Sequence, residues 1–152
     1  MKLVILTLIF CLYFIPSKAE LLKPNPSIKP EEVISIQLSA LKNNNFPFKN
    51  AGISQTWEFA HPQNRRYTGP LEKFTQMMYS SSYAIMLNHD FHKIIPVSQK
   101  NNIAYFFIEL TDKIGNKFGF QWTLQKIIVN GDFKNCWMTI GVSQPMTLAK
   151  SS

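Results

Sequence analysis

The sequence predicts one α+β domain, in which N-terminal helices pack on a curved, four-stranded antiparallel sheet. The chain has 152 residues, of which 45% are hydrophobic and 16% charged, and this balance is typical of a single globular domain. Apolar residues recur at helical spacing as far as about residue 87, and from residue 91 onward they alternate as in half-buried strands. Helices followed by a run of long strands is the element order of an α+β fold.

The first 19 residues predict a secretory signal peptide. A basic Lys2 precedes an apolar stretch over residues 3–15, and the small residues Ser17 and Ala19 form a cleavage site. This stretch would span about 20 Å as a helix, which is short of the roughly 30 Å hydrocarbon core of a bilayer. We therefore expect cleavage after Ala19, bacterial-type export to a periplasm or the outside, and no stable membrane span in the mature protein.

Cleavage changes the charge of the chain. It removes Lys2 and Lys18 but no acidic residue, so the net charge falls from +7 to +5. The remaining cations are scattered, with only Arg65 and Arg66 adjacent, whereas a nucleic-acid-binding surface needs clustered cations. We expect no nucleic-acid partner, and at most a weak attraction to anionic lipid or an acidic polymer.

Cleavage also removes Cys11 and leaves Cys136 as the single thiol of the mature protein. No intrachain disulfide is then possible. Cys136 precedes Trp137 in an apolar run, and free cysteines in such runs are usually buried. We expect Cys136 to be buried.

The mature chain is predicted to begin with an extended leader over residues 20–29, because this segment has two prolines and no periodicity. A single α+β domain is expected over residues 30–143. Pro30 followed by Glu31 and Glu32 favours the start of a first helix. Its apolar face continues until the polar residues 43–45 end it.

Further helical segments follow the first. A second helix is expected over residues 50–60. It should end there because the residue before Pro62 disfavours helical geometry. The polar segment 63–69 is expected to be a turn. A third helix is expected to begin at Pro70, and a short apolar segment follows at 83–87.

The second half of the domain is predicted to form the sheet. Lys126 breaks the alternation of apolar residues, which predicts a bulge or strong bend near Gln125. Residues 144–152 are expected to be a flexible tail. The expected strands are Phe91 to Ser98, Asn102 to Thr111, Lys117 to Val129 and Cys136 to Ser143.

Candidate catalytic residues lie between the second and third helices. His61 could act as a general acid or base, and Arg65 could hold an anionic substrate. Glu58 could remove a proton if its carboxylate points into a pocket. The alternative is structural: His61 ends a helix, while Arg65 bonds free backbone carbonyls or an acid such as Glu58 or Glu72.

A metal site is not expected. His89-Asp90-x-His92 contains ligand types, but neighbouring residues on a strand face opposite ways and zinc needs three or four converging ligands. The sequence also lacks a glycine-rich phosphate loop and a nucleophile motif. We therefore predict neither a metal nor a cofactor.

The aromatic content of 13% suggests a ligand surface as well as a core. Aromatic side chains on helices and strands could line a cavity, form a dimer face or simply fill the core. The candidate ligand-binding residues are Trp57, Tyr67, Phe74, Tyr105, Phe107 and Trp122.

Residues 31–143 resemble a bacterial and plant family catalogued as domain of unknown function number 4864. The resemblance rests mainly on Trp57-Glu58-Phe59-Ala60-His61-Pro62-x-Asn64-Arg65, with Gln37-Leu38-x-Ala40-Leu41 and Phe46-Pro47-Phe48 in support. That family is similar to the nuclear transport factor two-like and cystatin-like cones. This implies a pocket and often a homodimer. The cone group contains isomerases, dehydratases and binding domains, so the resemblance does not choose a function.

The function favoured by the sequence is that of an exported, non-enzymatic binding module. It would accept a small apolar or weakly anionic ligand, or a protein partner, against the curved sheet. The alternative is an isomerase- or dehydratase-like enzyme. That alternative requires His61 and a carboxylate to converge within about 3 Å, directly or through a water, inside a pocket.

Overall fold

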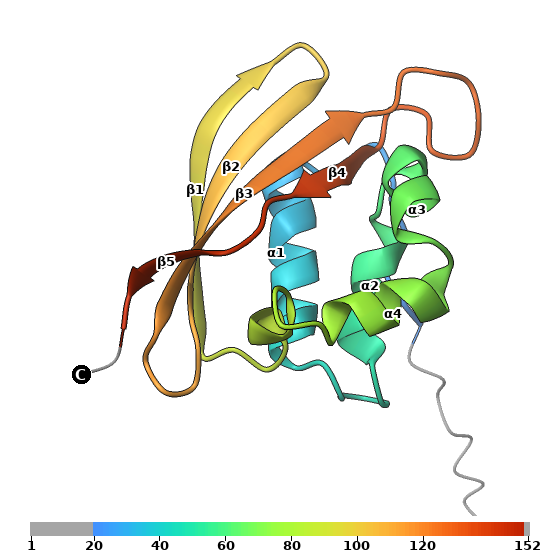
Figure 1. The fold of residues 1–152 in the computed structure, drawn as a ribbon. Helices are drawn as coiled ribbons and strands as arrows, with labels where there is room; N and C mark the ends of the chain where they lie inside the picture. The colour runs from blue at the N-terminus through green and yellow to red at the C-terminus, as the bar shows by residue number, and fades with distance from the viewer. Residues whose placement is uncertain (1–19, 151–152) are drawn as a thin grey trace, which may run out of the picture.

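The computed structural model describes residues 20–150, and it confirms the α+β prediction (Figure 1). Helices precede an antiparallel sheet and cover one of its faces. Within residues 20–150 no helix is long and apolar enough to cross a bilayer. The predicted signal peptide, residues 1–19, lies outside the described part of the chain. The helices are α1 (Pro30–Lys42), α2 (Ala51–Glu58), α3 (Pro62–Thr68), α4 (Leu71–Met78) and the short 3-10 helix η1 (Ala84–Met86).

Helix α1 begins at the proline and the two acidic residues that predicted its start. Pro30 occupies the first turn together with Glu31 and Glu32, which favour the positive end of the helix dipole. The buried face of α1 lies against the other helices and the sheet, with Lys42 in the last turn. The side chains of this face are Val33, Ile34, Gln37, Leu38 and Leu41.

Helices α1 and α2 pack closely because Gly52 has no side chain. A Cβ atom at Gly52 would lie 2.2 Å from the Ala40 carbonyl oxygen. The Gly52 N–H donates to the Asn44 carbonyl at 3.0 Å, and the Ile53 N–H donates to the Asn44 side chain at 3.0 Å. This close approach brings the α1 side chain of Gln37 within hydrogen-bond distance of the α2 backbone.

The prediction of a turn over residues 63–69 is wrong, because helix α3 spans Pro62–Thr68. Pro62 favours the first turn, the His61 side chain accepts a hydrogen bond from the Gln63 N–H, and Gly69 ends the helix with φ +78°. None of its residues is fully buried. The helix therefore has no apolar periodicity from which a pattern could have predicted it.

The sheet has the strand order β1-β2-β3-β4, with every pair antiparallel, and it is visibly curved (Figure 1). Alternate residues of β2 and β3 face the helices and form the sheet side of the core, among them Ile108, Phe120 and Trp122. The strands are β1 (Phe91–Lys100), β2 (Ile103–Thr111), β3 (Lys117–Lys126), β4 (Trp137–Val142) and β5 (Met146–Ala149).

The pattern break near Gln125 has two structural causes. The strand expected to reach Val129 ends at Lys126, where the chain leaves the sheet. The register between β3 and β4 also shifts between Thr123 and Leu124, which leaves Ile140 as the extra residue. The bulge is thus close to the predicted place, but its additional residue belongs to β4.

The prediction of a flexible tail over residues 144–152 is partly wrong, because Met146–Ala149 form β5. Strand β4 pairs only with Trp122–Lys126 of β3 and leaves the first part of that strand without a partner on this side. Strand β5 pairs with Lys117–Gly119 along the same edge. All four β5 side chains are exposed, so backbone hydrogen bonding fixes this strand. The sequence has no burial pattern from which β5 could be predicted.

A second, smaller core lies beside the main one. It consists of Ile127, Cys136 and Met138, with Phe133 packed against them. Cys136 is a free, buried thiol, as predicted, and burial raises its pKa. Ile127, Phe133 and Cys136 belong to the loop of residues 127–136, which connects β3 to β4 (Figure 1), and Met138 belongs to β4.

Candidate functional site

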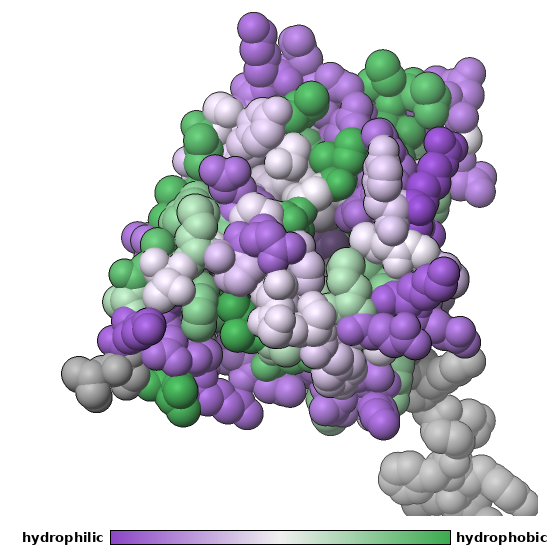
Figure 2. Space-filling model, in the orientation of Figure 1, coloured by the Kyte–Doolittle hydropathy of each residue, from purple (hydrophilic) through white to green (hydrophobic). Residues whose placement is uncertain are grey.

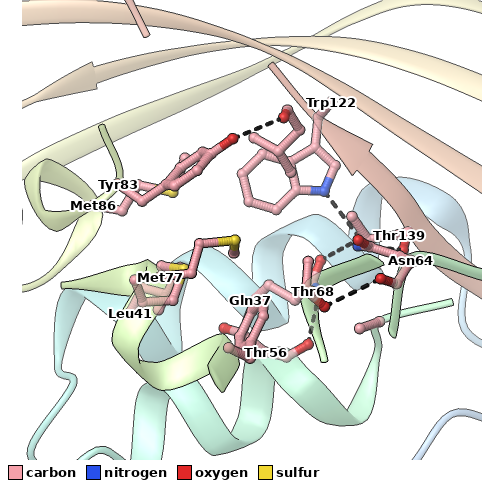
Figure 3. Close-up of a pocket in the computed structure, with 14 residues that line it drawn as sticks. Gln37, Leu41, Thr56, Asn64, Thr68, Met77, Tyr83, Met86, Trp122 and Thr139 are labelled. Carbon is pink, nitrogen blue, oxygen red and sulfur yellow. Dashed lines mark hydrogen bonds between the residues drawn. The ribbon is translucent and has the colours of Figure 1, made fainter. Parts of the chain in front are cut away.

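A cavity of about 80 Å³ lies between the curved sheet and the helices (Figure 3). Its buried lining is mainly apolar, with Leu41, Met78, Met86 and Trp122 among these side chains, but it also includes the polar Gln37, Thr56 and Thr139. Figure 2 shows a shaded hollow on this face of the molecule, between the strands and the shorter helices. All four α-helices, the 3-10 helix η1 and strands β3 and β4 supply its walls.

The rim of the cavity comes from the shorter elements. Half-buried side chains from α3, α4, the turn before η1 and the end of β4 surround the opening. The two that belong to α3 are polar, and the other three are large and mainly apolar. These rim residues are Asn64, Thr68, Met77, Tyr83 and Val142.

The lining of this cavity carries no formal charge. It contains no Asp, Glu, Lys, Arg, His or Cys side chain, and Tyr83 is its only titratable residue. Burial raises the pKa of the Tyr83 hydroxyl, so this group stays protonated at neutral pH. The cavity can hold a molecule and orient it through hydrogen bonds. Its own walls offer no carboxylate–imidazole pair for proton transfer.

A buried hydrogen-bond chain crosses the inner wall. The Trp122 Nε1–H donates to Thr139 Oγ1 at 3.0 Å, and that hydroxyl donates to Gln37 Oε1 at 2.6 Å. Gln37 Nε2 then donates to the Thr56 carbonyl at 3.0 Å. Every role is fixed, because an indole N–H only donates and a carbonyl only accepts. The chain joins β3, β4, α1 and α2 in the order drawn in Figure 3.

The other polar groups of the lining face the cavity as acceptors. The hydroxyls of Thr56, Thr68 and Tyr83 donate their protons to backbone carbonyls at 2.8, 3.1 and 3.3 Å. The Asn64 amide nitrogen donates to the Thr139 carbonyl at 3.3 Å. Each of the three hydroxyl oxygens therefore retains lone pairs and has no further proton to donate, whereas Asn64 keeps one amide N–H as well as its Oδ1 acceptor. A ligand that carries a hydrogen-bond donor would complement this lining.

The structure places Arg65 outside the cavity and gives it the structural role considered from sequence. Its guanidinium donates to the carbonyls of Ala60, Trp57 and Glu58 at 3.0, 2.8 and 3.1 Å. It also lies over the Trp57 ring at 4.8 Å. Arg65 thus satisfies the free carbonyls at the end of α2, and it is not among the residues that line the cavity.

His61 and Glu58 do not meet in a pocket. His61 Nδ1 accepts the Gln63 N–H at 3.0 Å, and burial lowers the pKa of this imidazole. The Glu58 carboxylate pairs with Lys23 of the leader at 2.9 Å. Within residues 20–150 no carboxylate is hydrogen-bonded to His61. His61 borders an open groove whose lining does not include Glu58, and the enzymatic alternative stays a prediction.

Two of the six aromatic candidates line the cavity: Phe74 and Trp122. Trp57 lies behind Phe74, with the two ring centroids 5.2 Å apart. Tyr67 is 83% exposed beside α3. The remaining two, Tyr105 and Phe107, alternate with the buried side chains of β2 and so lie on the opposite face of the sheet.

Sequence reasoning missed the polar half of the site. Gln37 was taken only as part of a family motif, although it interrupts the buried face of α1 one turn after Val33 and one turn before Leu41. A glutamine in such a face needs a buried partner, and this was a usable signal. Thr139 and Tyr83 gave no comparable signal, because their partners lie 102 and 59 residues away in sequence.

The His89 and His92 pair forms a separate buried cluster. His89 Nδ1 contacts the Met86 carbonyl at 2.7 Å, and its Nε2 lies 2.7 Å from His92 Nδ1. Because a carbonyl only accepts, neutral His89 carries its proton on Nδ1 and accepts from His92 through Nε2. Among residues 20–150, no group of three or more His, Cys, Asp or Glu side chains could hold a metal ion.

Comparison with known proteins adds no relative. No family model matches the chain, and no curated protein or solved structure matches it. The resemblance to the domain-of-unknown-function family and to the cone folds stays a prediction. The argument for function therefore rests on the cavity itself.

Proposed function

We propose that this protein is an exported, non-enzymatic binding module that accepts a small, neutral, mainly apolar molecule in the cavity beneath its sheet. The observation that carries the proposal is the lining: apolar walls, no charged side chain, and several lone pairs that face inward. A pocket with apolar walls and a few oriented polar groups is typical of small-molecule sites.

The size and polarity of the cavity define the ligand class. An apolar cavity of about 150 Å³ holds benzene, so a space of about 80 Å³ suits a molecule with fewer heavy atoms. Methionines 77, 78 and 86 line the cavity and can move to admit a larger ligand. Because the lining contains no cation, the proposal is restricted to neutral ligands. The weakly anionic ligands that the sequence analysis also allowed are left out of it.

We expect a ligand with one hydrogen-bond donor to bind best. Butan-1-ol and diethyl ether are isomers, and only the alcohol can donate a proton to the hydroxyls of Thr56, Thr68 or Tyr83. One neutral hydrogen bond contributes about 0.5–1.5 kcal/mol, so the alcohol should bind about two- to tenfold more tightly than the ether. Butyrate should bind at least about tenfold more weakly than the alcohol, because its charge would lose hydration without a partner.

Tryptophan emission can follow this binding. The substitutions Trp57→Phe and Trp137→Phe leave Trp122 as the only tryptophan, and it lines the cavity. Filling the mouth with Thr68→Trp would introduce a second emitter, so Thr68→Leu is the better blocking variant. Thr75→Leu, on the exposed side of α4, is its matched control. Equal affinity for butyrate and butan-1-ol, or unchanged binding in Thr68→Leu, would contradict the proposal.

Export is a separate part of the proposal and rests on residues 1–19 alone. When the full chain is produced in a bacterium with a secretory pathway, N-terminal sequencing of the processed protein should give Glu20 as the first residue. A protein that retains Met1, or that begins elsewhere, would contradict this part without affecting the ligand proposal.

A further inference from the structure

An exposed apolar patch lies at the end of the molecule opposite the β2–β3 hairpin. Ile128 and Val129 are adjacent in the loop 127–136, and they are 67% and 68% exposed. Tyr67 of α3 is 83% exposed, and with these two residues it lines an open groove of about 400 Å³. The loop projects beyond the rest of the sheet (Figure 1), and Figure 2 shows hydrophobic atoms there flanked by hydrophilic ones.

The loop holds these apolar side chains in fixed positions. Its two ends are joined by hydrogen bonds between Ile127 and Cys136 at 3.0 Å and between Asn135 and Ile127 at 2.7 Å. The loop's own Ile127 and Cys136 pack with Met138 of β4 in the small core. The Phe133 ring lies 5.9 Å from the Arg65 guanidinium, which ties the loop to α3. Ile128 and Val129 thus remain outside while their neighbours are buried.

Cations surround this patch. Arg66 and Lys126 line the same groove as Ile128 and Val129. Lys134 lies on the loop, where its Nζ donates to Asn130 Oδ1 at 2.7 Å. Asp132 is the only acidic residue within the loop 127–136. The patch therefore combines projecting aliphatic side chains with a positive surround.

We propose that α3 and the loop 127–136 dock on the surface of an anionic lipid bilayer. Ile128 and Val129 would enter the interfacial region, and Arg66, Lys126 and Lys134 would contact lipid phosphates. Aliphatic side chains with nearby cations suit this environment. A bilayer is favoured over a protein partner because the apolar part is a narrow projecting loop, whereas a stable protein interface usually buries about 800 Å² on each side.

Vesicle sedimentation of the mature protein tests this proposal. We expect binding to vesicles of phosphatidylglycerol and phosphatidylcholine, and little binding to phosphatidylcholine alone. Each cation near such a membrane contributes about a fivefold increase in partitioning, so the triple variant Arg66→Gln, Lys126→Gln, Lys134→Gln should bind about a hundredfold more weakly. Binding of the unaltered protein should also fall as salt is added.

The hairpin at the other end of the molecule supplies the matched control. Ile114 is 71% exposed and follows Lys113, so Lys113→Gln with Ile114→Ser removes one cation and one exposed aliphatic side chain from a different place. Ile128→Ser with Val129→Ser should weaken vesicle binding at least about tenfold more than this control. Equal effects of the two pairs, or equal binding to both vesicle types, would overturn the proposal. Self-association abolished by the loop variants without vesicle binding would overturn it in favour of a protein interface.

This docking is independent of the cavity. The variants at Ile128 and Val129 should still bind butan-1-ol with unchanged affinity, because neither residue lines the cavity. That measurement also shows that these variants are folded. A loss of both properties together would indicate unfolding, and the conservative variant Ile128→Ala should then be used; vesicle binding of this variant equal to that of the unaltered protein would overturn the proposal.

Discussion

Replacing Thr139 by valine should lower the free energy of unfolding by about 2–6 kcal/mol. The substitution keeps the shape of the side chain and removes the hydroxyl that joins Trp122 to Gln37. A buried indole N–H and a buried amide oxygen would each lose a partner, and each unsatisfied group costs about 1–3 kcal/mol. Urea denaturation of the mature protein, followed by tryptophan emission, measures the change.

The control for this prediction is Thr123→Val. Thr123 lies on β3 next to Trp122, half-buried, with its side chain on the other face of the sheet. It makes none of the hydrogen bonds of the buried chain, so the same substitution there should change stability by less than about 0.5 kcal/mol. Equal losses in the two variants would mean that the hydroxyl of Thr139 does not hold the wall of the cavity together.

Acidification should destabilise the protein through His89. Burial, as the main cause, lowers the pKa of His89 from 6.5 to about 4; the hydrogen bond with the Met86 carbonyl opposes this shift, His92 and Lys42 add to it, and Asp90 has a small opposing effect. As the pH falls below 6.5, His89 therefore becomes protonated in the unfolded chain while it stays neutral in the folded protein. Stability should be unaffected above pH 6.5 and should decrease by about 3 kcal/mol on acidification to pH 4.

The variant His89→Asn isolates this effect. Asparagine can donate to the Met86 carbonyl, as His89 Nδ1 does, but it does not titrate. The variant should start less stable at neutral pH and should lose less stability on acidification than the original protein. His92 also has a pKa lowered by burial, so some pH dependence should remain. Parallel pH profiles for the two proteins would show that His89 is not responsible.

Periodicity was sufficient to predict the architecture but not its short elements. The first helix and strands β2 and β3 carry regular apolar patterns, and burial produces such patterns directly. Helix α3 and strand β5 contain no fully buried side chain. They are fixed by backbone hydrogen bonds and by Pro62 and Gly69, so no hydrophobic signal exists for them in the sequence.

The same limit explains what was predicted of the site. Phe74 and Trp122 follow from the rule that aromatic residues facing a core can border a cavity. The polar lining depends on which segments the fold brings together, such as Gln37 with Thr139 at 2.6 Å. The catalytic candidates were chosen for their chemistry, and the structure shows that the local backbone uses His61 and Arg65 for its own hydrogen bonds. Titratable residues between two helices are often needed for capping.

The measurement that tests the cavity most directly is methionine-methyl NMR during titration with butan-1-ol. Met77, Met78 and Met86 line the cavity, whereas Met138 lies in the small core and Met146 on exposed β5. The account predicts saturable shifts of the first three methyl signals and none of the last two. Shifts confined to Met138 and Met146, or equal in all five, would contradict it.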